Sequence, residues 1–202
     1  MPFGPEALPA LVVFALVTSI TPGPNTMMLL ASGVNFGFRR TLPHMLGVAL
    51  GFAAMLTVVG LGLGAAITAS PVLHGVLRVA STAYVLWLAW KLASSGSFGS
   101  ERDAARPMTF VEAALFQWIN PKAWAIAVAA AAVHVRPDAF LASVALIALV
   151  FALVGLPSNG CWAGFGVALR GFLSVPARLR AFNIVMAVLL AASVLPFAGS
   201  AP

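Results

Sequence analysis

The sequence has few charged residues for its length. Lys, Arg, Asp and Glu together make up 8% of its 202 residues, whereas 61% are hydrophobic. A soluble domain carries about 25% charged residues, which keep its surface in contact with water. We therefore predict an integral membrane protein, forming a single domain over residues 1–202, whose outer surface is solvated by the lipid bilayer.

Several chemical classes are excluded by what the chain lacks. Cys161 is the only cysteine, so no disulfide can form within the chain and no dithiol redox mechanism is available. The sequence contains no recognisable nucleophile–base pair or metal-ligand cluster, so we expect no enzyme, no metal and no cofactor. The net charge is +6, but the sequence contains no polar domain that could present a basic face to nucleic acid. Nucleic acid is therefore not an expected partner.

Six apolar stretches are long enough to cross a bilayer core, which requires roughly 20 residues. The first begins near an N-terminus without basic residues, so it reads as a retained span rather than a cleaved signal. The first and fifth stretches are too long for one straight crossing and contain prolines, so bent or broken helices are expected there. The stretches cover residues 7–36, 42–69, 72–92, 110–133, 139–168 and 181–198.

The basic residues between the stretches predict the orientation of the chain. The segments that follow the first, third and fifth stretches hold eight Lys and Arg residues, whereas the segments on the other side hold only Arg136. Because positive segments remain in the cytoplasm, both termini are predicted to be periplasmic.

The two halves of the sequence share one plan. Residues 1–95 and 109–202 each contain a Pro-interrupted stretch, a Gly-rich one and a shorter one, separated by a cytoplasmic linker at 96–108. Three spans per half require the second half to insert upside down. We therefore predict an all-α fold of two inverted three-helix repeats, the plan of many secondary transporters.

The first stretch is interrupted by Thr-Pro-Gly-Pro-Asn. Pro22 and Pro24 have no N–H, so two carbonyls four residues earlier lose their helical donors. A new helix should begin with Gly23 near its N-cap. Freed carbonyls suit an ammonium group and a helix N-terminus suits a carboxylate, so a zwitterionic amino acid fits both. The predicted substrate-binding residues here are Thr21, Pro22, Gly23, Pro24, Asn25 and Thr26.

The fourth stretch is interrupted by Asn-Pro-Lys in the same way. Asn120 is expected to cap a helix that starts at Pro121, and the carbonyl of Gln117 is expected to be free. Lys122 then lies near mid-membrane, where a cation costs about 2.5–3.5 kcal/mol or more, with no acidic residue near mid-span. We predict that Asn120, Pro121 and Lys122 bind substrate and that Lys122 receives its carboxylate.

Three further residues carry weaker predictions. Asn159, beside Pro157 in the fifth stretch, either holds helices together or lines the substrate cavity. His44 and Glu112 are candidates for carrying a coupling proton. The alternatives are that His44 is an interfacial histidine without a role and that Glu112 is simply solvated.

Pairs of glycines spaced four apart predict close helix packing and say little about chemistry. These pairs are Gly33/Gly37, Gly47/Gly51, Gly60/Gly64 and Gly160/Gly164.

The sequence resembles the LysE/RhtB-type amino-acid exporters over nearly its whole length. The motifs that carry the resemblance are "TPGPNTMMLLASGVNFGFRRTLPHMLGVALGF", "LRVASTAYVLWLAWK", "FQWINPKAW" and "GLPSNGCWAGFGVALR". The resemblance implies a bacterial inner-membrane exporter of amino acids or close derivatives, driven by the proton gradient. Some members have an acidic residue in the fifth span, where this chain has none over 156–160.

The residues and the resemblance together predict alternating access around a site between the two interruptions. Without acidic residues in the membrane, the protein is expected to prefer neutral or aliphatic amino acids over basic ones. A non-transporting membrane subunit or scaffold is the alternative function. The expected partners are the amino acid and the bilayer, and the sequence leaves a homodimer open.

Overall fold

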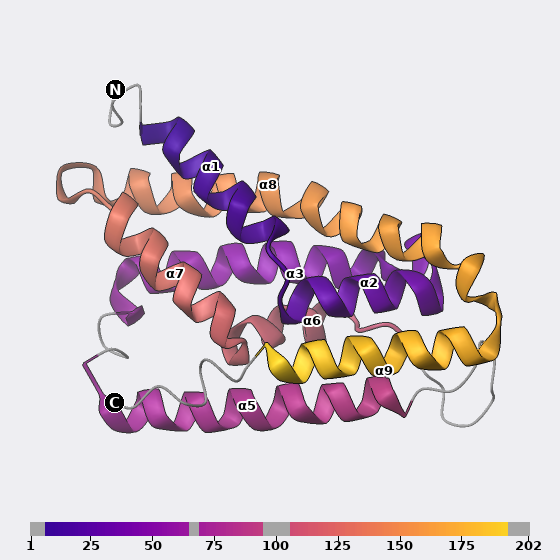
Figure 1. Cartoon of the computed structure of the whole chain (residues 1–202). Helices are drawn as coiled ribbons and strands as arrows, with labels where there is room; N and C mark the ends of the chain where they lie inside the picture. The colour runs from indigo at the N-terminus through magenta and orange to yellow at the C-terminus, as the bar shows by residue number, and fades with distance from the viewer. Residues whose placement is uncertain (1–6, 65–68, 95–105, 194–202) are drawn as a thin grey trace.

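The computed structural model describes residues 7–64, 69–94 and 106–193, and these are almost entirely helical (Figure 1). Residues 96–105 of the predicted linker and both ends of the chain lie outside the described residues. The helical elements, in chain order, are α1 Ala7–Ile20, α2 Pro24–Phe36, α3 Phe38–Val58, η1 Val59–Leu63, α5 Pro71–Ala93, α6 Phe110–Phe116, η2 Gln117–Ile119, α7 Pro121–His134, η3 Pro137–Ala139, α8 Phe140–Leu169, η4 Phe172–Ser174 and α9 Pro176–Ala192.

Each apolar stretch of the sequence corresponds to one of these helices or to a broken pair. Within the described residues, two continuous segments, Phe38–Leu63 and Pro137–Leu169, are long and apolar enough to cross a membrane. The pair α1 and α2 also qualifies when taken together, with a bend of 56° between its helices. An all-helical membrane protein is thereby confirmed, whereas six crossings and an inverted repeat stay predictions.

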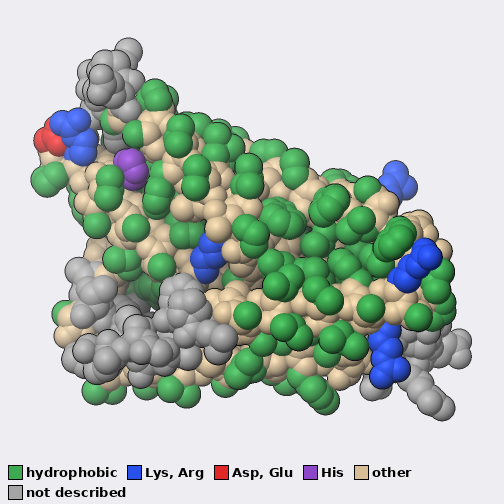
Figure 2. Space-filling view, in the orientation of Figure 1, with side chains coloured by type: hydrophobic (Ala, Val, Ile, Leu, Met, Phe, Trp, Pro, Cys, Tyr) green, Lys and Arg blue, Asp and Glu red, His purple; other side chains and the backbone are tan. Residues whose placement is uncertain are grey.

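Hydrophobic side chains cover most of the molecular face in Figure 2. Many large hydrophobic side chains are exposed, such as Val72 at 77% and Leu153 at 66%. Lys and Arg side chains gather mainly at the end of the molecule where α8 turns into α9 (Figures 1 and 2). An apolar middle with basic residues at one end is the pattern expected of a membrane protein.

The fifth stretch was expected to bend or break at Pro157, but α8 continues through this residue as one helix of 30 residues. A single proline removes only one N–H, and neighbouring helices can stabilise the backbone around it. Here the next two side chains, Ser158 and Asn159, donate hydrogen bonds to α1 and α3. The prediction of a break in this stretch was therefore wrong, whereas a bend at Pro157 stays a prediction.

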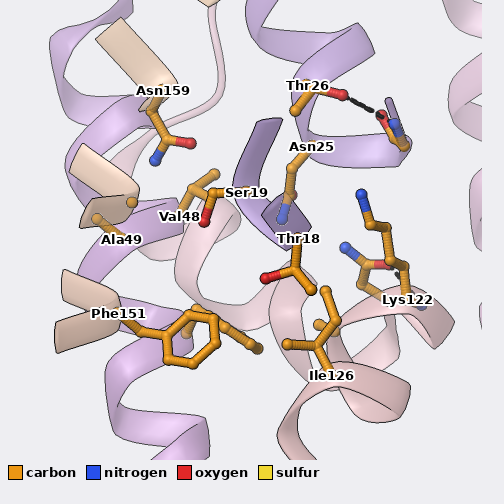
Figure 3. A pocket seen from close by; sticks show the side chains of 15 residues that line it. Thr18, Ser19, Asn25, Thr26, Val48, Ala49, Lys122, Ile126, Phe151 and Asn159 are labelled. Carbon is orange, nitrogen blue, oxygen red and sulfur yellow. Dashed lines mark hydrogen bonds between the residues drawn. The ribbon is translucent and has the colours of Figure 1, made fainter. Parts of the chain in front are cut away.

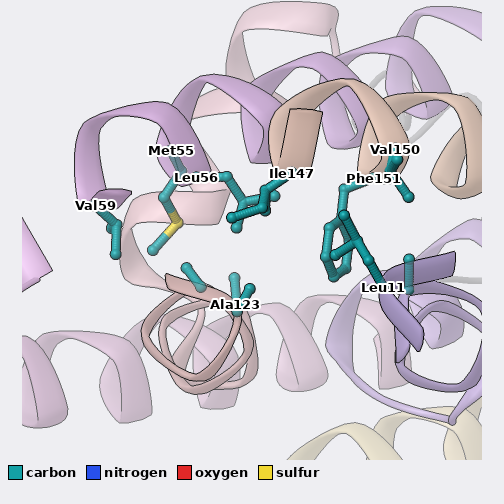
Figure 4. Close-up of a cluster of buried hydrophobic side chains, with 11 residues drawn as sticks. Leu11, Met55, Leu56, Val59, Ala123, Ile147, Val150 and Phe151 are labelled. Atoms are coloured by element: carbon teal, nitrogen blue, oxygen red, sulfur yellow. The ribbon is translucent and has the colours of Figure 1, made fainter. Parts of the chain in front are cut away.

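Helices α2, α3 and α8 form the centre of the bundle, with α6 against α3 and the pair α5 and α9 to one side. The largest buried cluster lies between α1, α3, α7 and α8, where Leu11, Met55, Ile147 and Phe151 pack together (Figure 4). In a membrane, such packing must supply the association energy, because lipid tails are as apolar as the side chains they replace.

Glycines allow α2, α3, α6 and α8 to approach very closely. A Cβ added at Gly33 would collide with the Ala163 carbonyl, and one at Gly166 would collide with the Leu30 carbonyl. The predicted pair Gly47/Gly51 packs in the same way on α6. The predicted pair Gly160/Gly164 does not, since a Cβ at Gly164 would meet no atom within 4 Å.

The contrast within α8 gives a testable prediction. Gly166→Ala should lower the free energy of unfolding by about 1–3 kcal/mol, because its methyl group meets a backbone carbonyl that cannot rotate away. Gly164→Ala, two residues earlier on the same helix, is the matched control and should not lower it. Thermal unfolding of both variants in detergent measures the difference. Equal stability of the two variants would contradict the close α2–α8 contact.

Candidate functional site

The break between α1 and α2 is built as the sequence predicts. Gly23 is the N-cap of α2 and Pro24 its first residue. The Thr26 hydroxyl accepts a hydrogen bond from the Gly23 N–H at 2.8 Å and donates one to the Gly23 carbonyl at 2.9 Å. The Thr26 side chain thus satisfies the N–H of the N-cap residue, and the Gly23 carbonyl also accepts the Met27 N–H at 3.0 Å as the first backbone hydrogen bond of α2.

The break between α6 and α7 also begins a new helix at a proline. Asn120 caps α7, and its side-chain oxygen accepts a hydrogen bond from the Lys122 N–H at 3.1 Å. The expectation that the Gln117 carbonyl is free was wrong, because this carbonyl accepts the Asn120 N–H at 3.3 Å. The chain tightens into the short 3₁₀ turn η2 before the break, which supplies that donor.

A reciprocal pair of amide hydrogen bonds joins the two breaks. The Asn25 amide donates to the Gln117 side-chain oxygen at 2.8 Å, and the Gln117 amide donates back to Asn25 at 3.2 Å. The same Gln117 amide also donates to the Ala113 carbonyl at 2.8 Å, and the residue is fully buried. The start of α2 and the end of α6 are therefore held in one arrangement.

Lys122 makes the second connection between the breaks. Its ammonium donates to the Thr21 carbonyl at 2.5 Å and contacts the Pro22 carbonyl at 3.4 Å. Gly23 allows this approach, since a Cβ there would lie 2.7 Å from Lys122 Cδ. The backbone at Gly23 is extended, with φ −179°, so space and not conformation is what requires glycine. Carbonyls released by the first break thus bind a cation supplied by the second.

Helix α8 contributes two further hydrogen bonds to the same region. The Ser158 hydroxyl donates to the Ser19 carbonyl at 3.1 Å, near the end of α1. The Asn159 amide donates to the Met45 carbonyl of α3 at 3.2 Å. Asn159 therefore holds two helices together.

These elements line a partly open cavity of about 60 Å³. One water molecule occupies about 10–15 Å³ on this measure, so the cavity has room for roughly four to six atoms the size of a water oxygen. In Figure 3, Asn159 lies on one side of the cavity and Lys122 on the other, with Ile126 and Phe151 at one end. The lining residues are Thr18, Ser19, Gly23, Asn25, Thr26, Val48, Ala49, Phe52, Asn120, Lys122, Ala123, Ile126, Phe151, Gly155 and Asn159.

The cavity separates polar groups from apolar ones. Oxygen and nitrogen groups come from the two breaks and from Asn159, whereas the apolar part comes from α3, α7 and α8. Among the 15 described residues that line it, none is acidic, and Lys122 is the one with a charged side chain. Such a cavity offers hydrogen-bond donors to an anion, but no acidic side chain to a cation.

The cavity brings together six of the ten predicted substrate-binding residues. Those that line it are Gly23, Asn25, Thr26, Asn120, Lys122 and Asn159. Four others are absent from the lining. The Thr21 and Pro22 carbonyls contact the ammonium of Lys122, and Pro24 and Pro121 start the two helices.

Sequence reasoning missed several lining residues and the amide of Gln117. Thr18 and Ser19 lie within one turn before the first break, so their position next to it was the available signal. Val48, Phe52 and Phe151 give no signal, because nothing distinguishes them from other apolar residues of a membrane helix.

The two proton-carrier candidates are absent from the cavity lining. His44 lies in the second turn of α3, at the start of the second apolar stretch as expected, and is 1% exposed. Glu112 lies in the first turn of α6, where its carboxylate pairs with Arg106 at 2.6 Å and accepts the Thr109 N–H at 2.8 Å. Thr109 and Glu112 form a capping box, so Glu112 stabilises the start of α6.

Comparison with known families agrees with this architecture. The family model described as LysE type translocator matches residues 16–199. This chain belongs to the LysE type translocator family. The resemblance found in the sequence is thereby confirmed, and the family places the protein among membrane transporters and not among enzymes.

Curated relatives of this translocator are named for efflux. It is 32% identical to the "Cysteine/O-acetylserine efflux protein" of Escherichia coli (strain K12) over 188 residues. The aligned residues make up 92% of this chain and 94% of the relative. The proteins of that name from Shigella sonnei (strain Ss046) and Shigella flexneri match to the same extent. No solved structure matches the chain.

The amide pair between the breaks of this translocator can be tested by a double-mutant cycle. Asn25→Ala and Gln117→Ala should each lower the free energy of unfolding by about 1–3 kcal/mol, because each leaves a polar group unpaired. The double variant should lose less than the sum, with a coupling of about 0.5–3 kcal/mol. Thermal unfolding in detergent measures it. The control combines Asn25→Ala with Ser143→Ala, which lies in the first turn of α8. Their effects on the free energy of unfolding should be additive.

Proposed function

We propose that this protein exports small neutral amino acids, or close derivatives of them, across the bacterial inner membrane. The cavity between the two helix breaks carries the proposal, because a cation, two helix N-termini and the carbonyls that bind this cation lie together there. The names of the efflux relatives, which cover nearly the whole chain, support amino-acid export in particular.

The carboxylate end of the substrate is assigned to Lys122 and to the start of α2. Lys122 is the charged side chain in the cavity lining, and Asn25 and Thr26 lie in the first turn of α2. A helix N-terminus favours an anion through its unpaired N–H groups and its dipole. A carboxylate between these groups would meet donors on both sides.

The ammonium end is assigned to the carbonyls at the end of α1. The Thr21 and Pro22 carbonyls already bind the Lys122 ammonium, which shows by its geometry that they accept a cation. A zwitterion that enters between Lys122 and these carbonyls offers each group its preferred partner. Substrate entry would then exchange one charge-assisted hydrogen bond for two.

The side-chain end faces Val48, Phe52, Ile126 and Phe151. A lysine or arginine substrate would carry its second cation into this apolar end, where the described lining offers no acidic partner, and a buried unpaired charge is costly. Small neutral or aliphatic side chains meet no such penalty. This supports a preference for neutral over basic amino acids, in keeping with the cysteine and O-acetylserine of the relatives' names.

The transport cycle proposed is alternating access driven by proton antiport, with six crossings and both termini in the periplasm. The lining comes from α1, α2 and α3 of the first half and from α7 and α8 of the second. Movement of one half against the other would therefore open and close the site. Basic residues gathered at one end of the molecule support this orientation (Figure 2).

Counterflow in proteoliposomes tests the proposal. Vesicles loaded with unlabelled amino acid should take up labelled cysteine or O-acetylserine, and serine or alanine should compete better than lysine or arginine. Lys122→Met should reduce counterflow at least tenfold, since a lost charged partner is worth roughly 1.5–3 kcal/mol. Lys91→Met, a lysine at the C-terminal end of α5, is the matched control and should leave it unchanged.

Gly23→Ala gives an independent check on the position of Lys122. Its Cβ would displace the Lys122 side chain from the Thr21 carbonyl without removing the charge, so it should also weaken counterflow. Counterflow of no amino acid by the wild type would overturn the proposed function. Competition by lysine and arginine alone would overturn the neutral preference.

A further inference from the structure

His44 is a buried titratable side chain with no assigned partner. It lies in the second turn of α3 and is 1% exposed. Among the described residues, neither ring nitrogen, Nδ1 or Nε2, has a hydrogen-bond partner. A neutral imidazole always carries one N–H donor, and buried donors are nearly always paired, so this arrangement requires an explanation.

The position of His44 links it to the substrate cavity. Val48, which lines the cavity, follows it by four residues and so lies on the same face of α3 about 6 Å further along the helix. Gly47, three residues after His44, packs directly against the Phe110 carbonyl of α6. Any shift of this face of α3 therefore reaches both the cavity and the helix that leads into the second break.

The elements packed against α3 supply few charges to His44. Helices α2 and α8 contain no Asp, Glu, Lys, Arg or His, and η1 and η2 contain none either. The neighbouring charged or titratable groups are Glu112 on α6, Lys122 and His134 on α7, and Arg39 and Arg40 on α3 itself. Cys161 on α8 is exposed.

The one carboxylate in this group, that of Glu112, already accepts four hydrogen bonds or ion-pair contacts. It pairs with both terminal nitrogens of Arg106, each at 2.6 Å, and accepts the N–H and the hydroxyl of Thr109. An imidazolium at His44 therefore has no free counter-ion in this arrangement. Adding a proton would favour a second arrangement, in which α3 shifts and the ring reaches Glu112 or water.

We propose that His44 carries the proton that is exchanged for the amino acid, a role that rests on the proposed function. The neutral imidazole fits the arrangement described here, and the imidazolium fits the alternate one. Through Val48 and Gly47 the change of arrangement alters the cavity and the second break together. Uptake and release of one proton at His44 thereby select between the two states of the site, as antiport requires.

Two transport modes of the full chain in proteoliposomes test this assignment. Counterflow of labelled cysteine needs no net proton movement, whereas accumulation against a concentration gradient needs an imposed pH gradient. His44→Gln should retain counterflow within about twofold and lose gradient-driven accumulation at least tenfold. His134→Gln, at the end of α7, is the matched control and should keep both. Accumulation by His44→Gln at the wild-type level would overturn the proposal.

A second variant keeps the test independent of how well His44→Gln folds. His74→Gln combined with His134→Gln leaves His44 as the only histidine, and it should accumulate cysteine as the wild type does. Loss of accumulation with counterflow intact would overturn the proposal. Wild-type protein with no counterflow would instead overturn the proposed function, and counterflow without any pH-driven accumulation would overturn proton exchange at His44.

Discussion

The ammonium of Lys122 on the Thr21 carbonyl is the interaction on which the rest of this structure depends. A helix break releases carbonyls from the helical ladder, and a lysine within an apolar stretch introduces a charge that lipid cannot solvate. Each is costly alone, and together they satisfy one another at 2.5 Å. The unpaired carbonyl and the unpaired charge thus compensate each other in one contact between the two halves of the chain.

The other contacts of the site follow from keeping the two breaks together. The hydrogen bonds between Asn25 and Gln117 fix the start of α2 against the end of α6. The Ser158 hydroxyl of α8 donates a hydrogen bond to the Ser19 carbonyl of α1. Gly33 and Gly166 separately allow α2 and α8 to pack closely behind this site. The cavity lies between the two helix breaks, and the hydrogen bonds between them fix its size and shape.

Much of this site could be predicted because proline and buried charge have consequences that do not depend on tertiary structure. The starts of α2 and α7 follow directly from Pro24 and Pro121, and the bounds of the first apolar stretch agree with the two helices found there. Pairing between distant residues could not be predicted. The sequence shows Lys122 without a counter-charge but not that its partner is a carbonyl, and it shows Gln117 only as a residue before a break.

Direct observation of a substrate would test the central claim, that the amino acid binds between the two breaks. An experimental structure of the protein in lipid nanodiscs with cysteine or O-acetylserine would serve. The account predicts the substrate carboxylate beside Lys122 Nζ and the start of α2, the ammonium at the Thr21 and Pro22 carbonyls, and Lys122 moved off those carbonyls. A substrate bound elsewhere in the bundle, with Lys122 still on the Thr21 carbonyl, would contradict it.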